Sequence, residues 1–148
     1  MPVKTPPDGY RSVTPMIIVE GAAGLIQFLE SVFGAKERLR MPMPDGKVGH
    51  AELEIGDSVV MVADATPEFP AAGCSVHLYI PDVDAAYKKA VEAGATSTME
   101  PADQFYGDRS AVVRDAYGNQ WSLATHIEDV SHAETMRRMS AMTGQQPA

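Results

Sequence analysis

Apolar side chains between residues 22 and 33 recur at intervals of three and four positions, which predicts an amphipathic helix. They are Ala22, Leu25, Ile26, Leu29, Val32 and Phe33. Gly34 suits the left-handed position that commonly ends a helix. The run over residues 13–19 is apolar and rich in β-branched residues, which predicts a strand before the helix.

Three more strands are expected after this helix. One passes through Leu39, and Pro44-Asp45-Gly46 then gives a strong turn signal. Residues 47–55 have the pattern of the partner strand, and Gly56-Asp57 turns the chain into a strand over residues 58–63. The first part of the chain therefore predicts the order β-α-β-β-β.

The same order recurs after a proline-containing linker over residues 65–74. Strands are expected over residues 75–80, 96–101, 111–114 and 120–126, with a loop over 104–109. Asp82 is a suitable N-cap for the second helix, whose apolar stripe is Val83, Ala86, Tyr87, Ala90 and Val91. Gly34 and Gly94 end the two helices 60 positions apart, and the turn glycines Gly56 and Gly118 lie 62 apart.

This periodicity indicates a duplicated unit. We predict an α+β fold in a single domain over 1–148, with two tandem βαβββ units at 10–64 and 75–126. Their curved mixed sheets would enclose a pocket. The alternative is an α+β domain whose halves resemble each other by accident. A C-terminal helix is expected over 131–143, because Ser131 and Glu134 form a capping-box pattern. Its methionines at 136, 139 and 142 share one face, which we expect to pack on the body or on a second subunit.

Composition narrows the function classes. The 148 residues carry a formal net charge of −8, which disfavours nucleic acid and anionic membrane surfaces as partners. No apolar run approaches the roughly 20 residues needed to span a bilayer, and the start of the chain has no hydrophobic signal core. Cys74 is the only cysteine, so no internal disulfide can form. We therefore expect a cytoplasmic protein.

Alternation along the strands predicts which side chains line the pocket. His50 and Glu52 should point away from the apolar, helix-covered face of their strand. His77 and Tyr79 should do the same in the second unit. Ser122 shares the semi-polar face of the last strand. Such faces can form a mostly apolar pocket with a few convergent polar groups.

The loop over residues 104–109 offers two more candidates. Tyr106 and Arg109 lie on either side of a glycine and an aspartate. Arginine can hold an anionic or carbonyl-bearing ligand through two parallel hydrogen bonds. The alternative is an exposed ion pair of small energetic value. Trp121 alternates onto the helix-facing side, where core packing is expected, and we assign no catalytic role to Cys74.

Several of these segments resemble the vicinal oxygen chelate superfamily, which includes glyoxalase I, bleomycin- and fosfomycin-resistance proteins and extradiol dioxygenases. The resemblance covers about residues 10–126. It rests on residues 19–35, on Asp82-Val83-Asp84-Ala85 and on the pattern Asp115-x-x-Gly118-Asn119-x-Trp121. Residues 41–53 and 106–109 further resemble a branch of glyoxalase-like proteins of unassigned function. The resemblance implies the predicted fold and, for the drug binders, a homodimer with pockets between subunits.

The superfamily's enzymes hold a divalent metal on the first and last strands of each unit, typically through histidines and glutamates. Transferred one at a time, those positions fall on Thr14, on Val60 (or Met61, if the hairpin shifts by one), on Ser75 and on Ser122. These residues do not form a good ligand set, since such metals need imidazole, thiolate or carboxylate groups. We therefore expect no cofactor. The alternative is a displaced site for Fe, Mn, Ni or Zn made by His50, Glu52 and His77.

Three hypotheses follow. The first is a homodimer that binds an aromatic or amphipathic small molecule without a metal. The second is a lyase, isomerase or dioxygenase built around the displaced site. The third is a module that engages a partner through the methionine-striped C-terminal helix.

Overall fold

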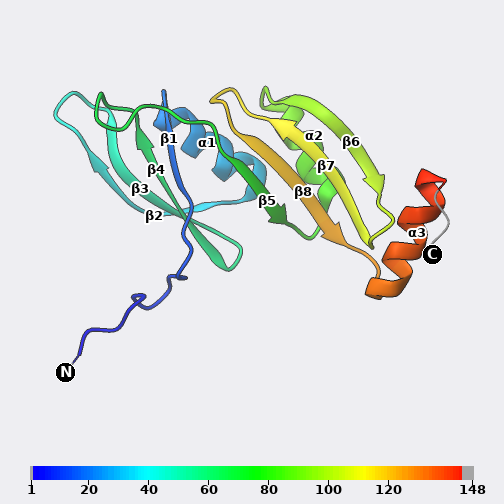
Figure 1. Ribbon diagram of the computed structural model, residues 1–148. Coiled ribbons are helices and arrows are strands. Elements are labelled where there is room, and N and C mark those ends of the chain that lie inside the picture. Colours follow the sequence, from blue (N-terminus) through cyan, green and yellow to red (C-terminus); the bar gives the residue numbers. More distant parts are fainter. Residues whose placement is uncertain (1, 145–148) are drawn as a thin grey trace.

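The computed structural model describes residues 2–144 and shows two four-stranded mixed sheets (Figure 1). The first unit contains β1 (Met16–Val19), α1 (Ala22–Phe33), β2 (Lys36–Pro42), β3 (Val48–Ile55) and β4 (Ser58–Asp64). Its strands lie in the order β1-β4-β3-β2. Only β1 and β4 run parallel, because α1 carries the chain across the sheet between β1 and β2.

The second unit repeats this order. It contains β5 (Ser75–Tyr79), α2 (Val83–Glu92), β6 (Thr96–Asp103), β7 (Asp108–Arg114) and β8 (Gln120–His126). The strand order is β5-β8-β7-β6, with β5 and β8 parallel. The two sheets lie side by side with their edge strands β1 and β5 toward the centre of the molecule (Figure 1). The duplicated βαβββ fold is thereby confirmed.

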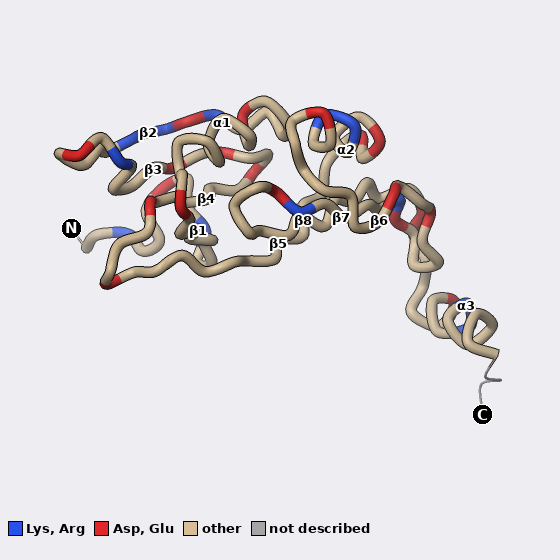
Figure 2. Tube along the Cα trace, turned by 90° about the horizontal axis from the view of Figure 1, so that it is seen from above, with Lys and Arg blue, Asp and Glu red and all other residues tan. Residues whose placement is uncertain are grey.

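The helices cover one face of this double sheet. Seen from above, α1 and α2 lie on the same side, and β1, β5 and the N-terminal segment lie on the other (Figure 2). The predicted apolar stripe of α1 is buried except for Phe33, which is partly buried, and Gly34 ends the helix with a φ of 67°. A single core runs through both units, and the Phe33 and Trp121 rings meet at a centroid distance of 5.2 Å. Within residues 2–144, no helix covers the opposite face of either sheet, and we call this the open face.

Some boundaries differ from the sequence prediction. The strand expected over 13–19 begins only at Met16, because Pro15 has no amide hydrogen to donate. Its carbonyl accepts the amide of Met61 instead. The strand expected from residue 111 begins at Asp108, which pairs with His126 and lengthens the hairpin by three residues. Pro101 lies within the edge strand β6, between shifts of register, as expected for proline in a sheet.

The third helix, α3 (His132–Thr143), lies beyond the end of β8 (Figure 1). The Ser131 hydroxyl caps it by accepting the Glu134 amide, as the capping-box pattern predicted. None of its residues is buried, and Arg138 ties it to Glu128 and to the Phe105 carbonyl. Its methionine face is therefore exposed in the single chain. Across residues 2–144 we find no helix with the length and apolar character that crossing a membrane requires.

Candidate functional site

The open face of the first sheet is set by strand register. Glu52 on β3 lies opposite Met61 on β4 and opposite Leu39 on β2, and His50 lies opposite Met41. Directly paired residues project from the same side of a sheet. The intervening residues of β3 contribute to the core, so the predicted alternation of this strand places His50 and Glu52 together on the open side.

Glu52 is the chemical centre of this face. Only 6% of the residue is exposed, and its two oxygens have different partners. The Tyr10 hydroxyl donates to Oε1, and Nε2 of His50 lies 2.8 Å from Oε2. These hydrogen bonds, that of Tyr10 first, hold the pKa of Glu52 below its usual range. The same bond raises the pKa of Tyr10, so a carboxylate faces a protonated phenol.

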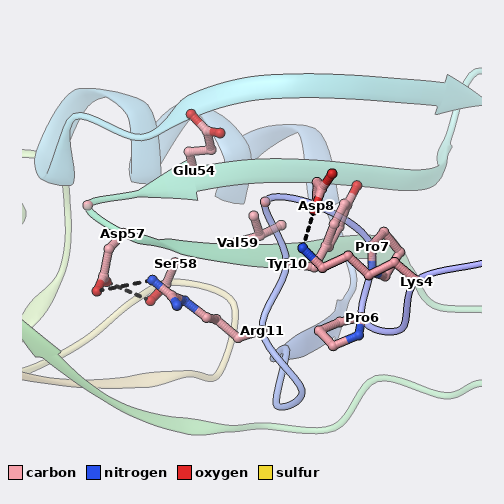
Figure 3. A pocket seen from close by; sticks show the side chains of 12 residues that line it. Lys4, Pro6, Pro7, Asp8, Tyr10, Arg11, Glu54, Asp57, Ser58 and Val59 are labelled. Carbon is pink, nitrogen blue, oxygen red and sulfur yellow. Dashed lines mark hydrogen bonds and ion pairs between the residues drawn. The ribbon is translucent and has the colours of Figure 1, made fainter.

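Tyr10 belongs to an N-terminal arm over residues 2–15 that crosses in front of the open face (Figure 3). The Arg38 guanidinium lies over its ring, 4.8 Å from the centroid. Between this arm and the β3–β4 hairpin lies a cavity of about 590 Å³. Its lining combines charged side chains, among them Lys4, Asp8 and Arg11, with apolar ones such as Pro7 and Val59. The arm therefore forms one wall of a cavity on the open side of the first sheet.

A second buried carboxylate lies on the open face of the other sheet. Asp108, at the start of β7, is 4% exposed. It accepts the Tyr79 hydroxyl at 3.3 Å and pairs with Nδ1 of His126 at 2.7 Å. Nε2 of His126 reaches Asp129 at 2.8 Å. The two carboxylates, Asp129 first, raise the pKa of His126, and the negative charge of Asp108 raises the pKa of Tyr79.

Three residues that the sequence predicted to line the pocket lie on the neighbouring strands of this face. His77 and Ser122 pair across β5 and β8, with Nδ1 of His77 2.9 Å from the serine hydroxyl oxygen. The His77 and Tyr79 rings meet edge to face at 4.9 Å. Ser110 follows Asp108 on the same side of β7, and its hydroxyl is buried without a hydrogen-bond partner in the described part of the chain. This face therefore combines aromatic rings with several groups that can form hydrogen bonds.

Arg109 differs from its expected placement. Because β7 already includes Asp108, alternation turns Arg109 toward the helix-covered side, away from His77 and Tyr79. Its guanidinium makes two hydrogen bonds to Asp84 of α2, at 2.8 and 2.9 Å, and one to Asp103 at 3.0 Å. These contacts match the ion-pair alternative and lower the pKa of Asp84. Tyr106 remains on the β6–β7 loop, close enough to Tyr79 to influence its pKa.

The structure thus forms two clusters from the predicted residues. His50 and Glu52 lie on the first sheet, whereas His77, Tyr79 and Ser122 lie on the second. Sequence reasoning missed Tyr10, Asp108 and His126. Extending the last hairpin of the second unit toward the loop would have placed Asp108 on the open face. Tyr10 has no such signal, because the arm follows no strand or helix pattern.

The positions that hold a metal in the superfamily's enzymes do not fit one here. Thr14 precedes β1, and its hydroxyl donates to the Arg11 carbonyl. The register puts Met61, rather than Val60, on the same side as Glu52. Serines occupy the two positions in the second unit. These hydroxyl and thioether groups are poor ligands for the expected divalent metals.

The three residues of the alternative metal site, His50, Glu52 and His77, do not come together either. His50 and Glu52 hydrogen-bond to each other on β3, and His77 bonds to Ser122 in the other sheet. Within residues 2–144, no three His, Cys, Asp or Glu side chains are grouped so that they could hold a metal ion.

Comparison with known proteins agrees with this architecture. Residues 11–123 match the family described as the Glyoxalase/Bleomycin resistance protein/Dioxygenase superfamily. An uncharacterized protein of Mycobacterium bovis is 36% identical over 141 residues, which cover 88% of this chain and 93% of that protein. An uncharacterized protein of Mycobacterium tuberculosis has the same identity and covers 88% of this chain and 83% of its own length.

Solved structures show the same fold. TioX from Micromonospora sp. ML1 is similar with a TM-score of 0.67 and 25% identity, over 79% of this chain and 99% of its own. A glyoxalase/bleomycin resistance protein/dioxygenase from Nocardioides gives a TM-score of 0.60 at 19% identity, over 88% and 90% of the two chains.

Proposed function

Since the chain belongs to the Glyoxalase/Bleomycin resistance protein/Dioxygenase superfamily, we propose that it binds a small organic molecule on the open faces of its sheets. A second copy of the chain would complete the cavity. The observation that carries this proposal is the pair of buried carboxylates, Glu52 and Asp108, each held by a tyrosine and a histidine on a face that no helix covers.

The chemistry of these faces favours a ligand with an aromatic surface and positive charge or hydrogen-bond donors. An ionised carboxylate has about four acceptor positions, and each of these two uses only two for side-chain donors. On the second sheet, the rings of His77 and Tyr79 stand beside Asp108 and can stack on a planar group. A cation can also lie over the face of a tyrosine ring. The net charge of −8 adds a general attraction for cations.

The exposed apolar residues on these faces support a homodimer. Met16 and Met41 on the first sheet are 53% and 56% exposed, and Tyr79 on the second is 63% exposed. Exposed apolar side chains on a face that no helix covers are typical of an interface or a ligand groove. A second copy facing these sheets would bury them and enclose the ligand.

Two measurements test this function. Light scattering after gel filtration should give the mass of a dimer. Calorimetric titration should show that 4-phenylbenzamidine binds at least about tenfold more tightly than 4-phenylbenzoate, which has the same shape and the opposite charge. His77→Ala should weaken amidine binding at least about fivefold, by loss of a ring beside Tyr79. His132→Ala, on the exposed side of α3, is the matched control. A monomer that binds neither compound would contradict the proposal.

Metal dependence is tested separately. Protein purified without chelator should contain less than about a tenth of an equivalent of Fe, Mn, Ni or Zn, because the donor set does not fit such ions. A stoichiometric metal that is lost in His50→Ala would overturn metal-independent binding and favour a metal-dependent enzyme.

A further inference from the structure

The contact between the N-terminal arm and Glu52 joins a phenol hydroxyl to a buried carboxylate. A free phenol would present the same two features as the Tyr10 side chain: a hydroxyl that donates to a carboxylate and a ring for a cation to cover. Glu52 and Arg38 supply these partners, and His50 holds the second oxygen of Glu52. The three residues come from β2 and β3, which pair with each other antiparallel without any contribution from the arm.

The arm itself is weakly attached. Among residues 2–144, the Tyr10 hydroxyl makes the only side-chain hydrogen bond between the arm and the rest of the chain. Arg11 approaches Asp57 at 3.9 Å in an exposed pair, and Lys4 pairs with Asp8 within the arm. The Pro15 carbonyl fixes only the base of the arm, at Met61. Segments with so few buried contacts open locally at a small cost in free energy.

We propose that Glu52, His50 and Arg38 form a receptor for a phenolic group, which Tyr10 fills in the free protein and which a phenol-bearing ligand takes over by displacing the arm. This rests on the proposed function, because it places part of the ligand on the open face of the first sheet. Tyr10 is then an internal competitor, and the arm closes over the site when no ligand is bound.

Displacement of the arm would leave room for such a ligand beside the β3–β4 hairpin. The cavity of about 590 Å³ lies between the arm and this hairpin, and its hairpin side, with Glu54, Asp57 and Val59, would stay in place when the arm leaves (Figure 3). A ligand larger than a phenol could extend along these residues. A tethered group competes at an effective concentration on the order of millimolar. The simplest phenols should therefore displace Tyr10 at millimolar concentration.

Limited trypsin digestion of the full chain reports the arm directly, because cleavage between Arg11 and Ser12 releases Tyr10. In the free protein, bound Tyr10 should protect this bond. We expect saturating p-cresol to speed its cleavage at least about threefold, whereas 4-methylanisole, which has no hydroxyl donor, should not. Cleavage after Lys88 in α2 should stay constant, which shows that p-cresol does not unfold the protein. Tyr10→Phe should be cleaved rapidly without ligand and should not respond to p-cresol.

Calorimetry with p-cresol identifies the receptor. Tyr10→Ala should bind p-cresol at least about fivefold more tightly than the original chain, because no competitor occupies the site. Adding Glu52→Gln to Tyr10→Ala should weaken binding at least about tenfold. Adding Glu92→Gln, on the exposed side of α2, should leave binding within twofold.

If p-cresol leaves cleavage after Arg11 unchanged, or if Glu52→Gln does not weaken its binding, the phenol receptor is refuted. That failure is distinct from failure of the proposed function, which depends on the dimer and on amidine binding that requires His77. Amidine binding without arm release would leave the proposed function intact and remove the phenol receptor alone.

Discussion

Replacing Asp115 with alanine should destabilise the protein more than almost any other change outside the apolar core. This residue lies in the β7–β8 turn and accepts four hydrogen bonds. Oδ1 accepts the backbone amides of Tyr117 and Asn119, at 2.8 and 3.0 Å. Oδ2 accepts Nδ2 of Asn119 at 2.9 Å and Nε1 of Trp121 at 2.8 Å. Asn119 and Trp121 are fully buried, so water cannot replace the lost acceptor for their side chains.

The expected magnitude follows from these two buried donors. A buried donor left without a partner costs about 1–3 kcal/mol, and two of them cost about 2–6 kcal/mol. We expect a loss of about 4 kcal/mol in the free energy of unfolding, near the upper end for a single substitution. For a chain of this length, that corresponds to a fall in melting temperature of roughly 10 °C.

Urea denaturation followed by circular dichroism at fixed protein concentration measures this loss. Asp57→Ala is the matched control, because Asp57 occupies the β3–β4 turn but its exposed side chain accepts one hydrogen bond, from the Ser58 hydroxyl, and lies 3.9 Å from Arg11 in an exposed pair. That variant should change stability by less than about 0.5 kcal/mol. In a Trp121→Phe background, which lacks the indole donor, Asp115→Ala should cost about 1–3 kcal/mol less. Equal costs in both backgrounds would refute the role assigned to the Trp121 hydrogen bond.

Three other changes test separate features. His126→Gln should remove a pH-dependent part of the stability. The raised pKa of His126 stabilises the original chain below about pH 6.5, and this stabilisation is lost as the pH rises through that pKa. Melting temperatures of the two proteins that differ equally at all pH values would contradict this. Gly107→Ala should lower the melting temperature more than Gly46→Ala, because both glycines have positive φ but a Cβ at 107 would lie 2.1 Å from a backbone carbonyl. Gly24→Ala should stabilise α1 by about 1 kcal/mol in a Tyr117→Ala background. The gain should be smaller in the original chain, where the Tyr117 hydroxyl occupies the space of the new methyl group. An equal gain in melting temperature in both backgrounds would contradict that contact.

Much of the fold was predictable because its determinants are local. Periods of two and of three to four residues predicted the strands and helices, and the glycines marked where they end. The same local alternation placed His77 and Tyr79 on one side of β5, opposite the apolar Val76 and Leu78. Alternation cannot be applied to a residue that is assigned to a loop, and Arg109 is the example. The first residues of β7 lie where the sequence reads as a loop, because their pairing with the end of β8 is a tertiary contact.

The least predictable part of the candidate site is the contact of Tyr10 with Glu52. These residues are 42 positions apart, and nothing in the arm has the spacing of a regular element. Asp108 and His126 are similar, since their pairing depends on the length of a hairpin rather than on any motif. Sequence alternation therefore identified the open faces, whereas the partners of the buried carboxylates required the three-dimensional structure.

The absence of strand pairing between the two sheets, within residues 2–144, has a consequence for how the chain folds. Every strand ladder joins residues of the same unit, so each sheet can form from a segment of about 50 residues without waiting for the other. The halves meet through side chains, where Phe33 contacts Trp121 and Tyr117 covers Gly24. We expect a half emerging first from the ribosome to complete its hydrogen-bonded framework early. Its exposed apolar flank would then remain vulnerable to aggregation until the second half docks.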